Sequence, residues 1–392
     1  MPTTSTIYTG DSASVEQTQR KVARKSNGDI WVTYRRSDGT YNQVWVAYST
    51  NKGSTWTEEQ VTDASAAQSG ASIAVDSDDN IHLVWGGSGW GDYTDKQQIC
   101  YRKRTSSWQT QEQVTNVDVN QNTPNIAIDS DDNVHVVWSG RGWGDYTTKA
   151  QIQYRKRTTS WQTQESVTNI DENHAWACIA IDSEDNIHVA WQSRGYGTYT
   201  ARQQIHYRKR TTSWQTIESV VDMDAGYQNQ PWIAIDSSDN VHVTWYGQGW
   251  GDYDTTYQIL YRKRTSSWQT TEQVTNKNAA QFLPSIALDT SDNVHITWFG
   301  TGWGTNTAVN NIQYRKRTSS WQTQVGITDE ATVNRVPIII YANYPDPKTN
   351  IPKEGYMFVY MKDSDVSIRF YASADLEWEG ETTDTSNFFL ML

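Results

Sequence analysis

The sequence predicts an all-β fold: a seven-bladed β-propeller with four antiparallel strands in each blade. Two observations lead to this prediction, a repeat of about 53 residues and a period of two within each repeat. The apolar residues that open the clearest copies recur at intervals of 53, 53, 54 and 53 residues: Ile73, Ile126, Ile179, Ile233 and Ile286. Units of about 40–50 residues with four strands each are typical of propellers, which join 4–8 such units into a ring.

The copy that begins at Ile126 shows the strand pattern most clearly. Residues 126–129 and 134–138 alternate in polarity on either side of a turn rich in Asp and Asn, which is typical of a hairpin. Residues 151–157 alternate as a third strand, and residues 161–168, which begin at Trp161, read as a fourth. No window has a sustained helical period of 3.6.

Two weaker copies extend the series, one over Val22–Tyr34 and one from Ile339. We therefore expect a single domain over residues 1–392, with repeats at approximately 15–65, 66–118, 119–171, 172–225, 226–278, 279–331 and 332–380, and closure or tail segments at 1–14 and 381–392. A propeller needs its ends to meet. Residues 3–9 are predicted to pair into the last blade and close the ring, and the apolar tail 388–392 is the competing closure.

Composition narrows the possible partners. The formal net charge is −12, which argues against a nucleic-acid backbone as the ligand. No apolar run is long enough to span a membrane and the first residues do not resemble a signal peptide, so we expect a cytoplasmic protein or one exported by a non-classical route. Of the 20 Trp, seven open the fourth strands, from Trp56 to Trp378, and five close the second strands. Packing between blades is the simplest role for both sets.

Other recurrent groups are assigned to structure. The Tyr-Arg-Lys-Arg runs are expected to pair locally with the acidic hairpin turns, and the strand histidines, such as His135, to pack rather than bind metal. The Asp-rich turn lacks the downstream carboxylate of an EF-hand loop. Cys100 and Cys178 fall on different strands of different repeats, so no disulfide is indicated. No metal or cofactor is expected.

One turn carries a family resemblance. Residues 48–56, Tyr-Ser-Thr-Asn-Lys-Gly-Ser-Thr-Trp, are close to the Asp-box pattern Ser-x-Asp-x-Gly-x-x-Trp, with Asn51 in the Asp position. The chain thus resembles sialidase-like Asp-box (BNR) propellers, and its architecture is similar to that of seven-bladed propeller lectins. The resemblance implies that ligands meet the end of the ring opposite this turn, where the second strand of each repeat connects to the third and the fourth connects to the next repeat.

The loops between the second and third strands are the main candidates for ligand binding. In five repeats this loop holds an aromatic residue between two glycines, as in Gly142-Trp-Gly-Asp-Tyr146. The first and last repeats lack it, so at most five sites are expected. An indole with no local side-chain support could stack on a sugar, and the neighbouring Asp could accept hydrogen bonds from hydroxyl groups; alternatively, each ring folds onto the neighbouring blade as a lid. The candidate ligand-binding residues are Trp90, Asp92, Tyr93, Trp143, Asp145, Tyr146, Tyr196, Trp250, Asp252, Tyr253 and Trp303.

A second set of polar residues stands five residues before the apolar start of each repeat. Seven polar groups at one position of a ring would line the mouth of the central channel, or would hydrogen-bond loop backbone instead. They are Gln17, Gln68, Gln121, His174, Gln228, Gln281 and Asn334.

Three classes of function fit these patterns. Repeated, nearly identical loops favour a multivalent, lectin-like propeller that binds glycans or glycoconjugates. A protein-binding or assembly propeller is the alternative, since Trp is frequent in interface hot spots. A sialidase-like glycosidase or polysaccharide lyase is the second alternative, but a cleft with two poised carboxylates is not visible. We therefore assign no catalytic residue and expect binding rather than catalysis.

Overall fold

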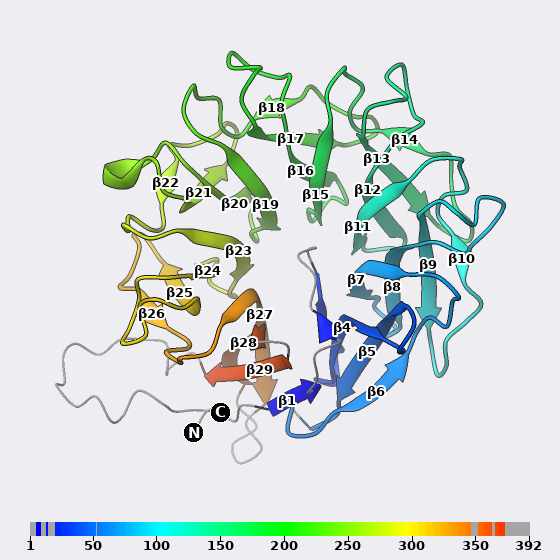
Figure 1. The fold of residues 1–392 in the computed structure, drawn as a ribbon, viewed down its shortest axis with the longest axis horizontal. Helices are drawn as coiled ribbons and strands as arrows, with labels where there is room; N and C mark the ends of the chain where they lie inside the picture. The colour runs from blue at the N-terminus through cyan, green and yellow to red at the C-terminus, as the bar shows by residue number, and fades with distance from the viewer. Residues whose placement is uncertain are drawn as a thin grey trace.

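The computed structural model describes residues 5–8, 13–14, 20–51, 53–345, 352–362 and 365–372. Within them the chain forms six four-stranded sheets and one five-stranded sheet, all antiparallel. The sheets are arranged in a ring, with the first strand of each repeat nearest the centre and the short fourth strand at the rim (Figure 1). The protein is an all-β propeller.

Five of the sheets follow one plan, in which the four strands of a repeat pair in chain order. The second repeat forms β7 (Gln68–Val75), β8 (Ile81–Gly87), β9 (Gln98–Arg104) and β10 (Glu112–Gln113). The third forms β11 (Gln121–Ile128), β12 (Val134–Gly140), β13 (Gln151–Arg157) and β14 (Glu165–Ser166). The fourth forms β15 (His174–Ile181), β16 (Ile187–Ser193), β17 (Gln204–Arg210) and β18 (Glu218–Ser219). The fifth forms β19 (Gln228–Ile235), β20 (Val241–Gly247), β21 (Gln258–Arg264) and β22 (Glu272–Gln273), with the short 3-10 helix η1 (Gly251–Tyr253) between β20 and β21. The sixth forms β23 (Gln281–Leu288), β24 (Val294–Gly300), β25 (Asn311–Arg317) and β26 (Val325–Gly326).

The two remaining sheets contain the ends of the chain. The first repeat forms the five-stranded sheet of β2 (Ala13–Ser14), β3 (Val22–Arg24), β4 (Ile30–Ser37), β5 (Asn42–Ser49) and β6 (Thr57–Gln60). The last sheet contains β27 (Asn334–Pro345), β28 (Pro352–Lys362) and β29 (Asp365–Ala372), and β1 (Ser5–Tyr8) is its fourth strand. Because β1 pairs antiparallel with β29, the prediction that an N-terminal strand closes the ring is confirmed. The competing tail, residues 388–392, and the Trp378 that would open a fourth strand lie outside the described residues.

Two details of the predicted blades need correction. The structure contains six four-stranded blades rather than seven, because β2 and β3 both pair with β4 and give the first sheet five strands. The fourth strand is also shorter than predicted: in the third repeat only Glu165 and Ser166 pair with β13. Trp161 instead makes an isolated bridge to Arg157, so this Trp stands at the entrance to the fourth strand.

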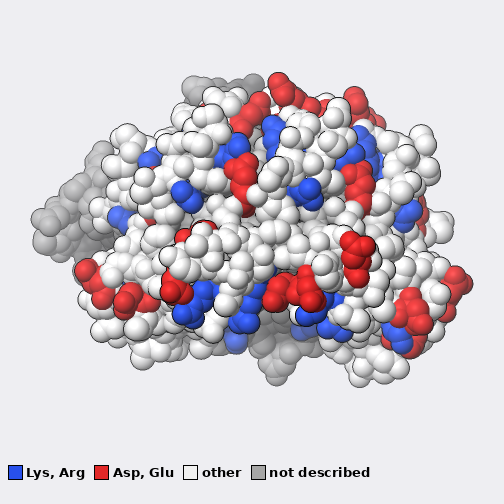
Figure 2. Space-filling model, turned by 90° about the horizontal axis from the view of Figure 1, so that it is seen from above, with Lys and Arg blue, Asp and Glu red and all other residues white. Residues whose placement is uncertain are grey.

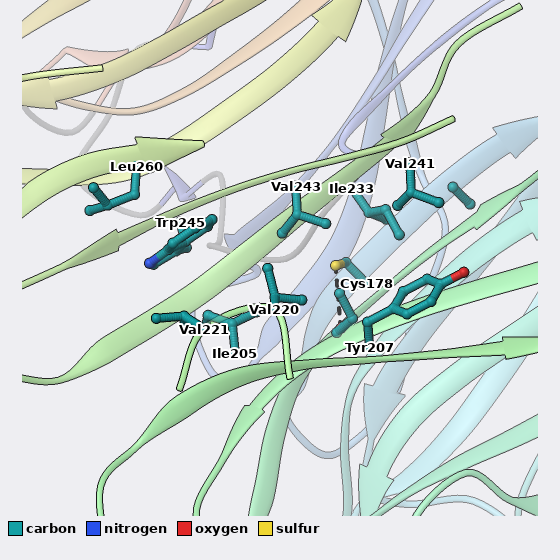
Figure 3. Close-up of a cluster of buried hydrophobic side chains, with 12 residues drawn as sticks. Cys178, Ile205, Tyr207, Val220, Val221, Ile233, Val241, Val243, Trp245 and Leu260 are labelled. Atoms are coloured by element: carbon teal, nitrogen blue, oxygen red, sulfur yellow. Dashed lines mark hydrogen bonds between the residues drawn. The ribbon is translucent and has the colours of Figure 1, made fainter. Parts of the chain in front are cut away.

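Large aromatic side chains pack the blades against one another. The Trp near the end of the second strand in the second to sixth repeats, such as Trp138, is completely buried. The Tyr of a third strand meets the rim Trp of the following repeat edge-on, as in the pair Tyr101 and Trp161 with ring centroids 5.4 Å apart. Figure 3 shows one such joint, where side chains from the fourth and fifth sheets, including Trp245 and Tyr207, form a single cluster.

Charged side chains also join neighbouring blades. The second Arg of each Tyr-Arg-Lys-Arg run binds a Glu on the preceding repeat through two nitrogens: Arg157 Nε and Nη2 lie 2.8 and 2.7 Å from the Glu112 carboxylate oxygens. The Lys of the run binds the Asp of the hairpin turn in its own repeat, and Lys156 Nζ lies 2.9 Å from Asp129 Oδ2. Basic and acidic residues consequently alternate over the side of the ring and do not form a single basic patch (Figure 2).

The hairpin turns between first and second strands hold a repeated polar network. His135 in β12 contacts the Tyr154 hydroxyl through Nδ1 at 2.8 Å and the Asp129 carboxylate through Nε2 at 2.9 Å. Burial lowers the pKa of His135 although its hydrogen bond to Asp129 opposes the shift, so the ring is neutral at neutral pH. Ser130 N and Oγ also donate to Asp185 of the next turn. These contacts account for the histidines and the acidic turns as structural groups.

No helix in the described part of the chain has the length and hydropathy to cross a membrane. Cys100 and Cys178 are both buried and unpaired. Among the residues placed by the structure, no cluster of three or more His, Cys, Asp or Glu side chains is arranged to hold a metal ion.

The closing strand β1 gives a direct test of the ring. Ile7 is buried in a cluster that also contains Val32, Val359 and Met361 of the first and last sheets. We expect Ile7→Ala to lower the free energy of unfolding by about 2–5 kcal/mol, the usual cost of truncating a buried aliphatic side chain, measured by chemical denaturation. The exposed neighbour in β1 provides the control, Thr6→Ala, which should change stability little; a loss below about 0.5 kcal/mol for Ile7→Ala would contradict closure by β1.

Candidate functional site

A buried glutamine anchors each of the predicted loops. In the third repeat Gln121, the first residue of β11, is completely buried. Its Oε1 accepts hydrogen bonds from two indoles, Trp138 Nε1 at 2.8 Å and the loop residue Trp143 at 3.0 Å. Its Nε2 donates to the backbone oxygen of Arg141 at 2.9 Å. One side chain thereby satisfies two indoles and fixes the loop to the blade.

The same arrangement recurs in the second, fifth and sixth repeats, and it changes the interpretation of the loop tryptophans. In each case the loop indole donates to the repeat's own glutamine, and its ring is half-buried. The loop indoles and their acceptors are Trp90 with Gln68, Trp143 with Gln121, Trp250 with Gln228 and Trp303 with Gln281. Of the two roles left open by the sequence, these contacts support the lid.

The residues proposed for the channel mouth are therefore structural elements of the blade. The six within the described residues have no exposed surface: Gln68, Gln121, His174, Gln228, Gln281 and Asn334. They open the first strands rather than precede them, and Gln17 lies outside the described residues. Glycine is required opposite the glutamine, because a Cβ on Gly140 would lie 1.7 Å from Gln121 Oε1.

The fourth repeat replaces this anchor with a different one. His174 stands in the glutamine position, Ser193 in that of the opposing glycine and Tyr196 in that of the loop Trp. Trp191 Nε1 lies 3.1 Å from His174 Nδ1 and 3.2 Å from Ser193 Oγ. Tyr196 is half-buried between two imidazoles, with ring centroids 5.7 Å from His174 and 5.1 Å from His206. These changes are coupled, because a glutamine at position 174 would collide with the Ser193 side chain.

The aspartates of the loops are held by a second repeated contact. Asp145 Oδ2 accepts a hydrogen bond from Asn169 Nδ2 at 2.7 Å, and Asn169 Oδ1 accepts one from the Asp145 backbone N at 2.9 Å. The same reciprocal pair joins Asp92 with Asn116 and Asp252 with Asn276. In the fourth and sixth repeats the carboxylate comes from the connection to the next repeat instead of from the loop: Asp222 and Asp329 accept hydrogen bonds from the loop backbone. A carboxylate therefore fixes the loop in both arrangements, whether it belongs to the loop or to the connection.

Tyrosine rings, rather than indoles, are exposed at this end of the ring. Tyr146 and Tyr253 of the predicted set are 38 % and 36 % exposed, whereas Tyr93 is half-buried. Tyr199, at the same position in the fourth repeat, is 38 % exposed, and Tyr227, in the connection before β19, is 42 % exposed. The set predicted from the sequence contains Tyr146 and Tyr253 but not Tyr199 and Tyr227, which are equally exposed.

Charged pairs lie beside the tyrosines on three consecutive repeats. The basic member comes from the loop and the acidic member from the connection to the next repeat: Lys96 with Asp118, Lys149 with Asp171 and Arg202 with Asp224, at 3.8, 3.3 and 3.3 Å. Arg141 and Arg194 add two exposed guanidinium groups. Neither forms a side-chain hydrogen bond or ion pair with the described residues.

A polar hollow of about 400 Å³ opens between the second and third repeats. It is lined by Lys96 and Asp118 on one side, by Asn122 and Arg141 on the other, and also by Val119, Asn120, Gly140 and Ala150. Asn122 is exposed and, like Arg141, has no side-chain partner among the described residues. The hollow lies at the same end of the ring as the tyrosines, because the same loops and connections form both.

The central channel is lined by strained backbone and apolar side chains instead of polar loops. Near the start of every first strand one residue has a positive φ, and six of these seven residues are not glycine: Arg20, Thr123, Trp176, Gln230, Leu283 and Val336, with Gly70 as the seventh. Below them, Ile, Ala, Val and Leu side chains line an apolar chamber of about 430 Å³. Arg20 Nη2 crosses it to donate to the Ile179 backbone oxygen at 3.0 Å, and burial lowers the pKa of Arg20.

Comparison with known proteins identifies the fold and leaves the family open. No family model matches the chain, so the resemblance to Asp-box propellers gains no support there. No curated protein matches either. Several solved structures, however, are similar to the chain. The polysaccharide lyase PL25 ulvan lyase, solved bound to -[GlcA(1-4)Rha3S]-, has a TM-score of 0.62 at 10 % identity, covering 94 % of both chains. Polysaccharide lyase Uly1 has a TM-score of 0.55 at 11 % identity, covering 93 % of this chain and 90 % of the other. A protein of unknown function from Dyadobacter fermentans DSM 18053 has a TM-score of 0.53 at 9 % identity, covering 79 % of this chain and 95 % of the other.

The fourth repeat should make the fold sensitive to acid. Burial lowers the pKa of His174 to about 3, whereas an unfolded His titrates near 6.5. The unfolded state therefore binds the proton first, and stability should fall as the pH drops from about 6.5 towards 3. The variant H174Q/S193G/Y196W restores the anchor of the other repeats, and at pH 5 it should lose about 2 kcal/mol less than the wild type relative to pH 7.

Denaturant titrations at the two pH values measure this difference. H174Q alone provides the control for the coupling of the three residues, because the collision with Ser193 should destabilise it at both pH values. Equal acid sensitivity of the triple variant and the wild type would contradict the assignment to His174.

Proposed function

We propose that this protein binds a polysaccharide on the end of the propeller that carries the exposed tyrosines. One observation carries the proposal: the five exposed large hydrophobic side chains of the described residues are all tyrosines on this end, namely Tyr41, Tyr146, Tyr199, Tyr227 and Tyr253. Exposed aromatic rings gathered on one face mark an interaction site more often than isolated ones do. A phenol ring offers a flat apolar surface for a sugar ring and a hydroxyl group for hydrogen bonds.

The repetition of the tyrosines supports a long ligand. Tyr146, Tyr199 and Tyr253 occupy the same loop position in three successive repeats, so a chain of sugars that crosses the blades meets the same group again. Weak contacts at linked sites add to a useful affinity when one ligand engages several of them. The names of the similar solved structures agree with this ligand class, since two of them are polysaccharide lyases.

The tryptophans have an indirect role in this proposal. Because Trp143 donates its indole N–H to Gln121, the ring is held against the blade and cannot turn outward without losing that bond. It supports the loop that presents Tyr146. The lectin-like interpretation is kept, with tyrosine in place of tryptophan as the contact residue.

Polysaccharide cleavage is a second candidate, favoured by the asymmetry of the fourth repeat. An enzyme needs one distinct site, and His174, Tyr196 and His206 form a group that departs from the glutamine anchor of the other repeats. Burial raises the pKa of Tyr196 to about 12 and lowers that of His206 to about 4, so at neutral pH the phenol is protonated and the imidazole is neutral. Incubation with ulvan, alginate and pectate, followed by reducing-end and unsaturated-uronate measurements, tests this candidate; turnover would favour it over binding alone.

The exposed tyrosines give the test of polysaccharide binding. We expect the double variant Y146A/Y199A to bind at least tenfold more weakly than the wild type, a loss of about 1.4 kcal/mol, because two stacking surfaces are removed. Affinity electrophoresis against ulvan, alginate, pectate and xylan provides the measurement. The variant Y146F/Y199F keeps both rings and should retain binding within about threefold.

Stability controls separate this effect from misfolding, since both substitutions are at exposed positions and should leave the thermal midpoint unchanged. Failure of the wild type to bind any of the four polysaccharides, or wild-type binding by Y146A/Y199A, would overturn the proposal. A protein captured instead by the same tyrosines would favour the assembly alternative.

A further inference from the structure

The hollow between the second and third repeats results from one departure from the repeat. Ala150 stands where the other clear copies carry a longer side chain: Gln97, Gln203, Tyr257 and Asn310. Two of those side chains occupy the corresponding space by contacting the first strands around them. Gln97 Nε2 donates to Ser69 Oγ at 3.3 Å, and Gln203 Nε2 donates to Asn229 Oδ1 at 2.5 Å. Alanine at position 150 cannot make either contact, so the space is open.

The walls of the hollow carry hydrogen-bonding groups that the protein itself leaves unused. Asn122 and Arg141 are exposed, and their side chains have no partner among the described residues. Asn120 Oδ1 accepts a hydrogen bond from the Gln97 backbone N at 2.9 Å. This bond fixes the side-chain amide and leaves its Nδ2 group available to donate to a ligand. Lys96 is half-buried, forms an ion pair with Asp95 and lies 3.8 Å from Asp118.

The charge of the hollow favours an anion. Lys96 and Arg141 are two cations beside one lining carboxylate, Asp118, which is 69 % exposed and therefore well solvated. Because Lys96 is also paired with Asp95, Arg141 is the cation of the hollow that no carboxylate of the described residues neutralises. A guanidinium group without a carboxylate partner is suited to bind a planar carboxylate or a sulfate through two parallel hydrogen bonds. The amides of Asn120 and Asn122 and the carboxylate of Asp118 supply both donors and acceptors, the combination that sugar hydroxyls require.

We propose that this hollow is a subsite for one sugar residue that carries a carboxylate or sulfate group. The proposal rests on the polysaccharide-binding function above and deepens it: the tyrosines supply affinity for the chain, and the hollow selects an acidic residue in it. The volume of about 400 Å³ falls within the range of roughly 300–1,000 Å³ seen for small-molecule sites. In this arrangement Arg141 and Lys96 bind the acidic group and Asn122 binds a hydroxyl.

The substitution A150Q tests the subsite by restoring the side chain of the second and fourth repeats. It should fold, because glutamine already occupies this position in two other blades, and it should fill the hollow. We expect A150Q to bind an acidic polysaccharide, ulvan or pectate, at least tenfold more weakly than the wild type, with binding of neutral xylan changed less than twofold. Asn310→Gln enlarges the equivalent position of the sixth repeat and provides the matched control, which should bind as the wild type does.

A small probe separates the subsite from the proposed function. D-glucuronate binding is measured by saturation-transfer NMR, with D-glucose as the neutral comparison. We expect glucuronate, but not glucose, to bind the wild type, to be lost in A150Q and R141Q, and to be retained in Y146A/Y199A. Weakening with added salt is expected because the contact is ionic.

The outcomes are distinct. Loss of polysaccharide binding in Y146A/Y199A together with wild-type behaviour of A150Q and R141Q overturns the subsite and leaves the proposed function intact. Glucuronate binding that A150Q abolishes, in a protein that binds no polysaccharide, supports the hollow as an acidic-sugar site and overturns the proposed function. Equal binding of glucose and glucuronate overturns the assignment to an acidic sugar.

Discussion

The loop end of this propeller depends on one buried carboxamide in each regular blade. Gln121 Oε1 has two acceptor directions and both are used, one by an indole of the strand framework, Trp138, and one by an indole of the loop, Trp143. A buried indole N–H or carboxamide without a partner costs about 1–3 kcal/mol, so these groups stabilise one another only as a set. The geometry then requires glycine opposite the amide, and Gly140 provides it. Where the fourth repeat changes the amide to His174, the opposing residue and the loop aromatic change with it.

Within one short loop, the residues that hold the loop to the blade differ from the residues that are available to bind a ligand. The middle residue of the Gly-x-Gly segment, Trp143, donates its indole N–H to Gln121, and the Asp145–Asn169 pair fixes the loop from the other side. The tyrosine that follows, Tyr146, is the exposed aromatic side chain of the loop. A framework that is identical in several blades can therefore present different groups at its free positions. The Lys96–Asp118 pair, Arg141 and the alanine at position 150 are such variations.

The strand framework could be predicted from the sequence because its signals are local. The period of two and the Asp-rich turns specify hairpins, and β1 was identified as the closing strand because the chain supplies a spare segment where a fourth strand is missing. The orientation of the loop indoles could not be predicted in this way, since the acceptor of Trp143 stands 22 residues upstream. A signal was nevertheless present. Asp145 with Asn169 becomes Thr198 with Asp222, and Gln121 with Gly140 becomes His174 with Ser193, so paired changes between repeats report spatial contacts. The hollow was also visible in outline, as a single alanine among larger residues, but the groups around it come from two repeats and only the structure brings them together.

The contacts between neighbouring blades have a consequence for how the ring assembles. Ser77 binds Asp132 in the same way that Ser130 binds Asp185 and Ser183 binds Asp239, so a middle blade recognises its successor by groups that every other middle blade also displays. During folding, an out-of-order neighbour would satisfy such a joint as well as the correct one. Contacts found at one joint only among the described residues, such as Ser139 Oγ to the His174 backbone oxygen and Gln230 N to Gln192 Oε1, distinguish the middle blades. The ends add a further distinction, where a five-stranded first sheet meets a last sheet completed by β1. A chain that gained or lost a middle repeat would therefore keep the shared Ser–Asp turn contacts, and the seam between the first and last sheets would still have to close around a ring of a different size.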